Sequence, residues 1–273
     1  MKKILIILLL TSYSCILLAQ KEIQKEDIFL NRTFSQDWVY GLNSMKDGLH
    51  YTTLEYEDTV SIEKHNYKTG KVVSVILKSS DIDLKFSGYK FNSSESLLLL
   101  EAETEKLYRH STKSIYYIFD TQSKELVKIS DKKIRLAEFS PNSKYVSYIY
   151  RNNIYAYNIK TGATTKITHK GLPNKIICGA TDWVYEEEFG FTKAYQWAPN
   201  SQSIAYYIFD ESKVPEFSMD VFEEGLYPRQ DRFKYPKAGE RNASVKINIF
   251  HFNDSKNIAA EVKTRNDFYI PRI

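Results

Sequence analysis

Short runs of aromatic and β-branched residues alternate along this chain with turns rich in Asn, Ser, Lys and Gly. The clearest example runs from 145–150 through an Arg-Asn-Asn turn into 154–159, and then through Lys-Thr-Gly into 164–168. Runs of this composition, joined by tight turns, predict antiparallel β-hairpins. Closing hairpins of the same kind are expected at 65–77 and 115–129.

The strand pattern itself repeats along the chain. Each repeat opens with an aromatic or apolar residue and small polar residues, and the four openings are Leu42, Phe91, Phe139 and Trp197, spaced 49, 48 and 58 residues apart. Repeats of this length made of antiparallel strands are typical of β-propeller blades. A two-layer sandwich would not explain the long-range period. We therefore predict an all-β fold, a partial β-propeller of about four blades, each an antiparallel four-stranded sheet.

The longest interval between repeats contains the most unusual segment, 182–188, which reads Asp-Trp-Val-Tyr-Glu-Glu-Glu. Three adjacent carboxylates repel one another, so a fold that fixes them usually needs a cation nearby. If Glu187 and Glu188 point into a cavity, a compact ammonium group such as a peptide N-terminus is a natural ligand. The alternative is a solvated acidic face, or the first turn of a helix whose dipole favours acidic residues. We expect a short helical insertion here.

The N-terminus is typical of an export signal at 1–19. Two lysines precede an apolar run at 4–10, and small Ala19 fits the position before a cleavage site. The run is too short to span a bilayer. Cys15 raises a lipoprotein alternative, but the Ser-Tyr-Ser before it lacks the usual apolar residue. We expect an exported protein, periplasmic or secreted, with an N-terminal segment at 20–40 and the propeller at 41–273.

Composition and spacing exclude several classes of function. The net charge of +4 falls to +2 when the two lysines of 1–19 are removed, which is too weak to indicate nucleic-acid binding. Cys178 is then the one cysteine, so neither a disulfide framework nor a Cys-rich metal site is expected. No two glycines stand four or five residues apart, which excludes a Gly-x-Ser-x-Gly elbow and a phosphate-binding P-loop. The histidines are scattered singly, and no cofactor or metal is expected.

Several longer motifs stand in a characteristic order. They are Tyr-Arg-His-Ser at 108–111, Thr-Asp-Trp-Val-Tyr-Glu-Glu-Glu at 181–188, Trp-Ala-Pro-Asn at 197–200 and Tyr-Pro-Lys-Ala-Gly at 235–239. On these motifs, nearly all of the mature chain resembles the N-terminal part of the dipeptidyl peptidase IV family, within the prolyl oligopeptidase family of serine peptidases.

The resemblance implies a structure and a role for particular residues. In that family an eight-bladed propeller caps an α/β-hydrolase domain, and dipeptides are released from peptides with Pro or Ala second. By motif position, Glu187 and Glu188 would bind the substrate's α-ammonium, and Arg109 would hydrogen-bond the carbonyl of its second residue. The segment 214–244 resembles an arm that contributes to homodimerisation. The segment 189–192 varies from some relatives, which could reshape the pocket wall, and a related tripeptidyl peptidase group uses a differently placed Glu.

The resemblance also implies which parts the chain lacks. The Ser-Asp-His triad of the family lies in the hydrolase domain, and its elbow motif is absent here, so this chain alone is expected to be inactive. Our hypothesis is an incomplete propeller, about half of an eight-bladed one, belonging to a longer exported peptidase. The alternative is a free-standing, non-catalytic propeller that binds peptide N-termini, and the sequence leaves both open.

Overall fold

The computed structural model describes residues 22–36, 38–56, 58–262 and 268–273, so the expected export signal at 1–19 and Cys15 lie outside the described residues. The chain divides into two compact units, 1–39 and 40–273. In the first unit the described residues contain one helix, α2 (Lys25–Phe29), which follows an N-cap at Gln24. No described helix is long and apolar enough to cross a membrane.

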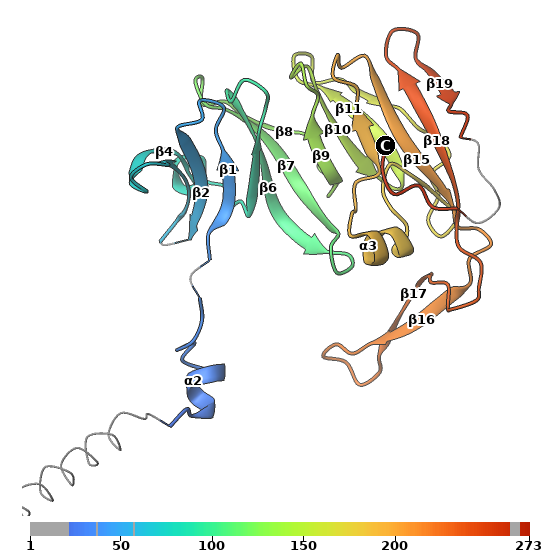
Figure 1. Cartoon of the computed structure of the whole chain (residues 1–273), viewed down its shortest axis with the longest axis horizontal. Coiled ribbons are helices and arrows are strands. Elements are labelled where there is room, and N and C mark those ends of the chain that lie inside the picture. The colour runs from blue at the N-terminus through green and yellow to red at the C-terminus, as the bar shows by residue number, and fades with distance from the viewer. Residues whose placement is uncertain (1–21, 37, 57, 263–267) are drawn as a thin grey trace, which may run out of the picture. The chain divides into compact units, whose positions relative to one another are not determined.

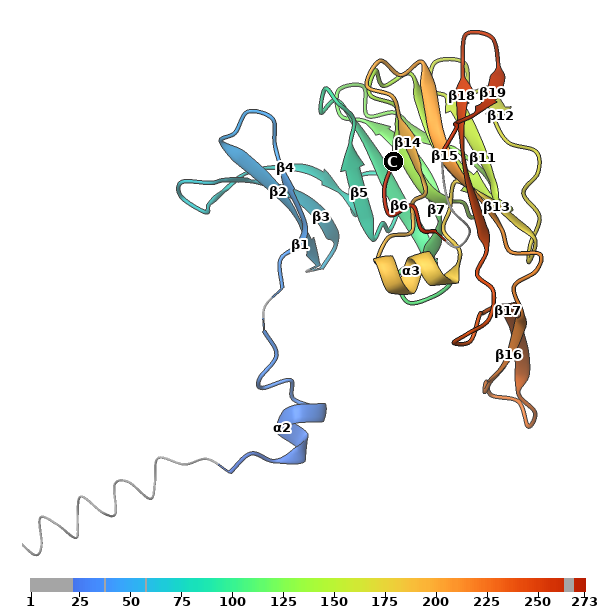
Figure 2. The same ribbon diagram turned by 45° about the vertical axis from the view of Figure 1, so that its right-hand side comes forward.

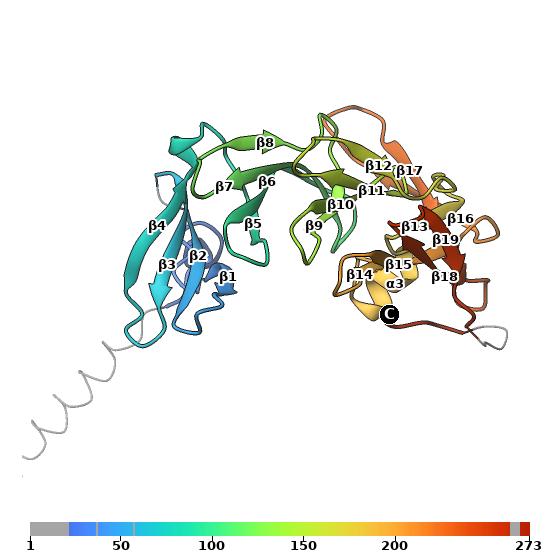
Figure 3. The same ribbon diagram turned by 90° about the horizontal axis from the view of Figure 1, so that it is seen from above.

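The second unit is built of antiparallel sheets that follow one another in chain order (Figures 1 and 3). In each of the first three sheets, consecutive strands are neighbours, as hairpins require. The first sheet contains β1 (Tyr40–Ser44), β2 (His50–Tyr56), β3 (Val60–Asn66) and β4 (Val72–Lys78), and is followed by a short 3₁₀ helix (Ser79–Asp81). The second contains β5 (Gly88–Phe91), β6 (Leu97–Lys106), β7 (Thr112–Asp120) and β8 (Leu126–Lys128). The third contains β9 (Arg135–Phe139), β10 (Tyr145–Tyr150), β11 (Asn153–Asn158) and β12 (Thr164–Lys166).

The fourth sheet departs from this scheme because one of its edge strands is interrupted. β13 (Ile176–Cys178) pairs with the C-terminal half of β15 (Ser203–Asp210), and β14 (Tyr195–Trp197) pairs with the N-terminal half of the same strand. The other edge of β15 pairs with β18 (Ser244–His251), which pairs with β19 (Lys256–Ala259). The segment between β13 and β14 is therefore an insertion in a single edge, and it accounts for the long spacing before Trp197.

Neighbouring sheets are held together by shared apolar cores. Leu54 and Ile62 of the first sheet pack with Leu98 of the second, and similar clusters join the second sheet to the third and the third to the fourth. Burying a side chain of this size stabilises the fold by about 1.5–3 kcal/mol. Face-to-face packing of successive four-stranded sheets is the architecture of propeller blades. The prediction of an all-β, partial propeller is confirmed.

A two-stranded arm extends from the fourth sheet between β15 and β18. It is formed by β16 (Glu216–Val221) and β17 (Arg229–Lys234), which pair with each other in their own small sheet (Figure 2). The arm falls within the segment 214–244 that the sequence sets apart. It lies close to the insertion, because the ring of Trp183 is 4.3 Å from that of Tyr235, just after β17.

Candidate functional site

The insertion leaves and rejoins the fourth sheet at Tyr207 of β15. Gly179 donates its N–H to the Tyr207 carbonyl, and the Tyr207 N–H donates to the carbonyl of Ala194. Gly179 has a φ of +79°, and a Cβ at this position would lie 2.6 Å from the Ile154 side chain. A glycine is therefore required where the chain turns out of the sheet. This geometry fixes both ends of the insertion to the core.

The insertion folds into a single short helix, α3 (Trp183–Phe189), with a cap at each end. The Asp182 side chain accepts a hydrogen bond from the N–H of Tyr185 at 3.0 Å, which is the usual contact of an N-cap residue. Gly190 ends the helix with a φ of +69°, the left-handed conformation that favours glycine. The expected helical insertion is therefore present, and its capping residues explain its length.

The three adjacent glutamates of α3 have three different environments. Glu186 is 1% exposed, whereas Glu187 is half-buried and Glu188 is exposed. Successive residues of a helix point about 100° apart, which separates them around the axis. The acidic run is therefore neither a uniform solvated face nor a single cluster, and each carboxylate has its own contacts.

Two of these glutamates contact the loop between β6 and β7. Arg109 Nε lies 3.3 Å from Glu187 Oε2, with the Arg109 side chain 74% exposed and that of Glu187 13% exposed. One residue further on, the N–H of His110 donates to Glu186 Oε1 at 3.0 Å. The predicted residues Arg109 and Glu187 are thus brought together, and the hydrogen bond to Glu186 attaches the same loop to α3.

A cavity of about 1040 Å³ adjoins this pair, between the β6–β7 loop, α3 and the arm. Five of its fourteen lining residues are aromatic, and six are charged: Arg109, Arg135, Glu187, Asp231, Arg232 and Lys237. The aromatic residues that line it are Tyr108, Trp183, Phe217, Phe233 and Tyr235. A concave site that combines aromatic walls with charged groups is typical of ligand binding. Glu188 does not line this cavity.

Arg135 adds a further cation to the lining of the cavity. Burial lowers the pKa of its guanidinium, and the negative charge of Glu186 partly offsets that effect. Its Nε has no hydrogen-bond partner among the described residues. Glu186 therefore has two functions that its position in the sequence does not disclose: it accepts the His110 N–H and balances a half-buried guanidinium.

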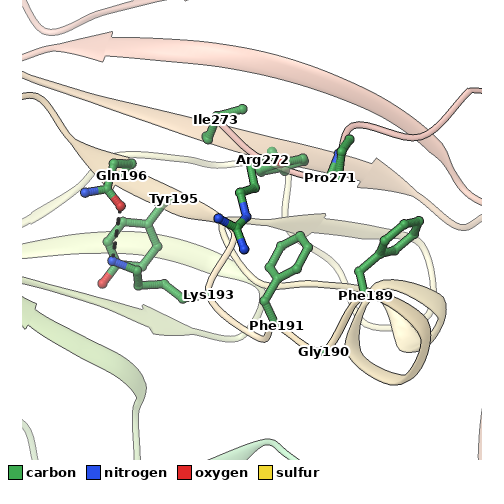
Figure 4. A pocket seen from close by; sticks show the side chains of 10 residues that line it. Phe189, Gly190, Phe191, Lys193, Tyr195, Gln196, Pro271, Arg272 and Ile273 are labelled. Carbon is green, nitrogen blue, oxygen red and sulfur yellow. Dashed lines mark hydrogen bonds between the residues drawn. The ribbon is translucent and has the colours of Figure 1, made fainter.

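A second cavity, of about 380 Å³, lies at the C-terminal end of α3 (Figure 4). Phe189 and Phe191 line it together with Lys193 and Arg272, and no carboxylate side chain lines it. The Tyr185 hydroxyl accepts the Ile270 N–H at 2.8 Å, which attaches residues 268–273 to α3. Because its charged side chains are cationic, this second cavity does not suit an ammonium ligand.

Two further carboxyl groups are buried near α3. Asp182 is 8% exposed, and burial raises its pKa to about 6 despite the hydrogen bond from Tyr185. Glu211, 6% exposed at the end of β15, has a pKa raised to about 7, mainly by burial and also by the charge of Asp182. The charge of Asp182 thus disfavours the ionisation of Glu211.

Comparison with known proteins connects this geometry to a family. Residues 92–273 match the model of the dipeptidyl peptidase IV (DPP IV) N-terminal region. The chain belongs to the dipeptidyl peptidase IV family. The chain is 31% identical to human prolyl endopeptidase FAP over 224 residues, which cover 81% of this chain and 28% of that protein. It is 35% identical to dipeptidyl peptidase 4 from pig over 184 residues, which cover 64% of this chain and 24% of that protein.

A solved structure of the family extends the likeness to the fold. The crystal structure of Porphyromonas gingivalis dipeptidyl peptidase 4 matches with a TM-score of 0.85 and 32% identity, covering 93% of this chain and 37% of that one. The chain therefore spans well under half the length of these dipeptidyl peptidase IV relatives. Arg109, Glu187 and Glu188 all lie within the matched residues 92–273.

Proposed function

We propose that this chain is the substrate-anchoring part of an exported dipeptidyl peptidase that releases Xaa-Pro or Xaa-Ala dipeptides. The observation that carries the proposal is the contact between Arg109 and Glu187, 3.3 Å apart on the wall of the large cavity. A carboxylate and a guanidinium side by side offer partners for the two polar groups at the start of a peptide, its α-ammonium and a carbonyl oxygen further along.

Binding exchanges the partners of the two side chains. The arriving α-ammonium takes the place of the guanidinium beside Glu187, and Glu188, which is exposed outside the cavity, is expected to turn toward it as the second carboxylate. Arg109, whose side chain is 74% exposed, is free to turn and donate to the carbonyl of the second substrate residue. Because the ammonium is held at a fixed depth, only the bond after the second residue reaches the reacting groups.

The bond cleavage itself is assigned to a different part of the enzyme. In this proposal an α/β-hydrolase domain supplies the Ser-Asp-His triad, in which the serine attacks the carbonyl carbon and the histidine transfers its proton to the leaving amine. The chain's share is positioning: holding two reactants in register can contribute about 7–11 kcal/mol to lowering a barrier. The match covers only 28% of the length of human prolyl endopeptidase FAP, and the remaining length of that relative supports a further domain.

Export and homodimerisation complete the proposal. The basic and apolar pattern of residues 1–19 supports delivery to the periplasm or outside the cell.

The tip of the arm supports homodimerisation, because its large apolar side chains are exposed: Phe222 is 81% exposed, Leu226 98% and Tyr227 87%. We expect Leu226→Glu to halve the mass of the chain in analytical ultracentrifugation, and a wild-type chain that sediments as a monomer would contradict the dimer.

Peptide binding tests the anchoring proposal. Titration calorimetry of the full chain with a short peptide carrying Pro second is expected to show saturable binding, weakened more than about tenfold when the peptide N-terminus is acetylated. Glu187→Gln is expected to cause a similar loss, because it removes the charge and keeps the shape. Glu125→Gln, in an exposed hairpin turn of the second sheet, is the matched control and should bind as wild type. Equal affinity for free and acetylated peptides would overturn the proposal.

A further inference from the structure

One face of the first sheet gathers three side chains that can ligate a metal. β2 and β3 pair so that Thr53 lies directly opposite Glu63. Glu55 and His65 each lie two residues along their own strands, so all four side chains share this face. The sheet is seen in Figure 2. One ligand atom from each of Glu55, Glu63 and His65 lies within 4.8 Å of the others, and none of the three residues is exposed.

The hydrogen bonds at this cluster fix the proton positions. The Thr53 hydroxyl has a single proton and donates it to Glu55 Oε1 at 2.7 Å. His65 Nε2 lies 2.8 Å from Thr53 Oγ1, whose proton is already donated, so His65 Nε2 must donate to Thr53 Oγ1. The ring is held by stacking on Tyr51, with the centroids 4.9 Å apart. His65 Nδ1 is buried and has no hydrogen-bond partner among the described residues.

The cluster also carries uncompensated negative charge. Glu63 Oε2 lies 3.8 Å from His65 Nε2, with the side chains 22% and 12% exposed. Within the described part of the chain, no lysine or arginine forms an ion pair with Glu55 or Glu63; Lys64, between the pair on β3, reaches Asp47 on the opposite side. Two partly buried carboxylates without a lysine or arginine partner are stabilised by a bound cation.

We propose that Glu55, Glu63 and His65 form a binding site for a divalent transition-metal ion, with Zn²⁺ the best match. One imidazole and two carboxylates are a common ligand set for zinc, and water can complete a four-coordinate site. Calcium requires six to eight oxygen ligands and magnesium a near-ideal octahedron, and neither favours imidazole. Ligand atoms up to 4.8 Å apart need side-chain rotations to converge on one ion, and a metal bound at His65 Nε2 displaces the proton that this nitrogen donates to Thr53. This site lies on the first sheet, outside the peptide-anchoring residues.

Titration of the metal-free full chain with Zn²⁺ is the test. We expect one ion bound per chain, and an affinity lowered at least about tenfold in both Glu63→Gln and His65→Gln. The matched control is His50→Gln, because His50 Nδ1 contacts Asp47 Oδ2 at 2.7 Å as a histidine–carboxylate pair outside the cluster. This variant should bind Zn²⁺ as the wild type does.

Cobalt gives a readout that needs no variant. Co²⁺ bound by an imidazole and two carboxylates is expected to produce a visible absorption spectrum that saturates at one ion per chain and is abolished by excess Zn²⁺. Because His65 packs on Tyr51, its replacement could disturb the sheet, and the isosteric Glu63→Gln then decides. No saturable binding of either ion, or equal affinity in Glu63→Gln and the wild type, would overturn the site.

Discussion

Replacing Glu186 by alanine is expected to lower the free energy of unfolding by about 3 kcal/mol and to weaken peptide binding at least about tenfold. The substitution leaves the His110 N–H without its acceptor at 3.0 Å and removes the charge that offsets burial at Arg135. The loop that carries Arg109 then loses its attachment to the helix that carries Glu187. Denaturant unfolding measures the first effect, and calorimetric titration with a peptide that carries Pro second measures the other.

The conservative variant separates positioning from general stability. Glu186→Gln retains an oxygen that accepts the His110 N–H and nearly the same volume, but it removes the charge beside Arg135. We expect it to lose stability while keeping peptide affinity within about threefold of the wild type, because the loop stays attached. If Glu186→Ala binds the peptide as well as the wild type, Glu186 does not position the site.

The free energy of unfolding is expected to fall as the pH rises from about 4 to about 7. Asp182 and Glu211 have folded pKa values of about 6 and about 7, against ordinary values of 3.8 and 4.5 for the free carboxyl groups. In this window the folded chain holds protons that the unfolded chain has released, so raising the pH favours unfolding. Each group contributes on the order of 3 kcal/mol, which is present below its unfolded pKa and lost above its folded pKa.

Two variants assign this pH dependence to the buried carboxyls. Asp182→Asn keeps the acceptor for the Tyr185 N–H, and Glu211→Gln keeps the shape of its side chain; each should flatten the profile of unfolding free energy between pH 4 and 7. Carboxylates with a lowered pKa, such as Asp210, change the free energy of unfolding below pH 4, so they do not alter the slope between pH 4 and 7. The assignment fails if stability rises across the window, or if the slope is unchanged in Glu211→Gln.

Much of the fold could be predicted from local sequence. Strand pairs such as 145–150 with 153–158 lie close together in the chain and carry their own turns, so their pairing is decided locally. The extra length before Trp197 indicated an insertion. It did not indicate that β13 and β14 form one interrupted edge of β15, because each has three residues and too little pattern to read.

The candidate site was predictable only in part. A run of identical glutamates contains no information on which one is buried, since that depends on the helix start at Asp182 and on the loop that packs against it. The sequence motif indicates Glu187 and Glu188 as site residues and gives no role to Glu186, because the burial of one glutamate depends on the tertiary contacts of the helix. Glu211 follows an aspartate and precedes a serine, which is typical of an exposed turn, and only tertiary packing buries it.

The most direct test of the account is a structure of the chain with a bound peptide that carries Pro second. We expect the α-ammonium to lie within hydrogen-bond distance of Glu187 and Glu188, and Arg109 to have left Glu187 and to donate to the carbonyl of the second residue. A peptide bound with its N-terminus elsewhere, or with the Arg109–Glu187 ion pair intact beside it, would contradict the anchoring role proposed for these residues.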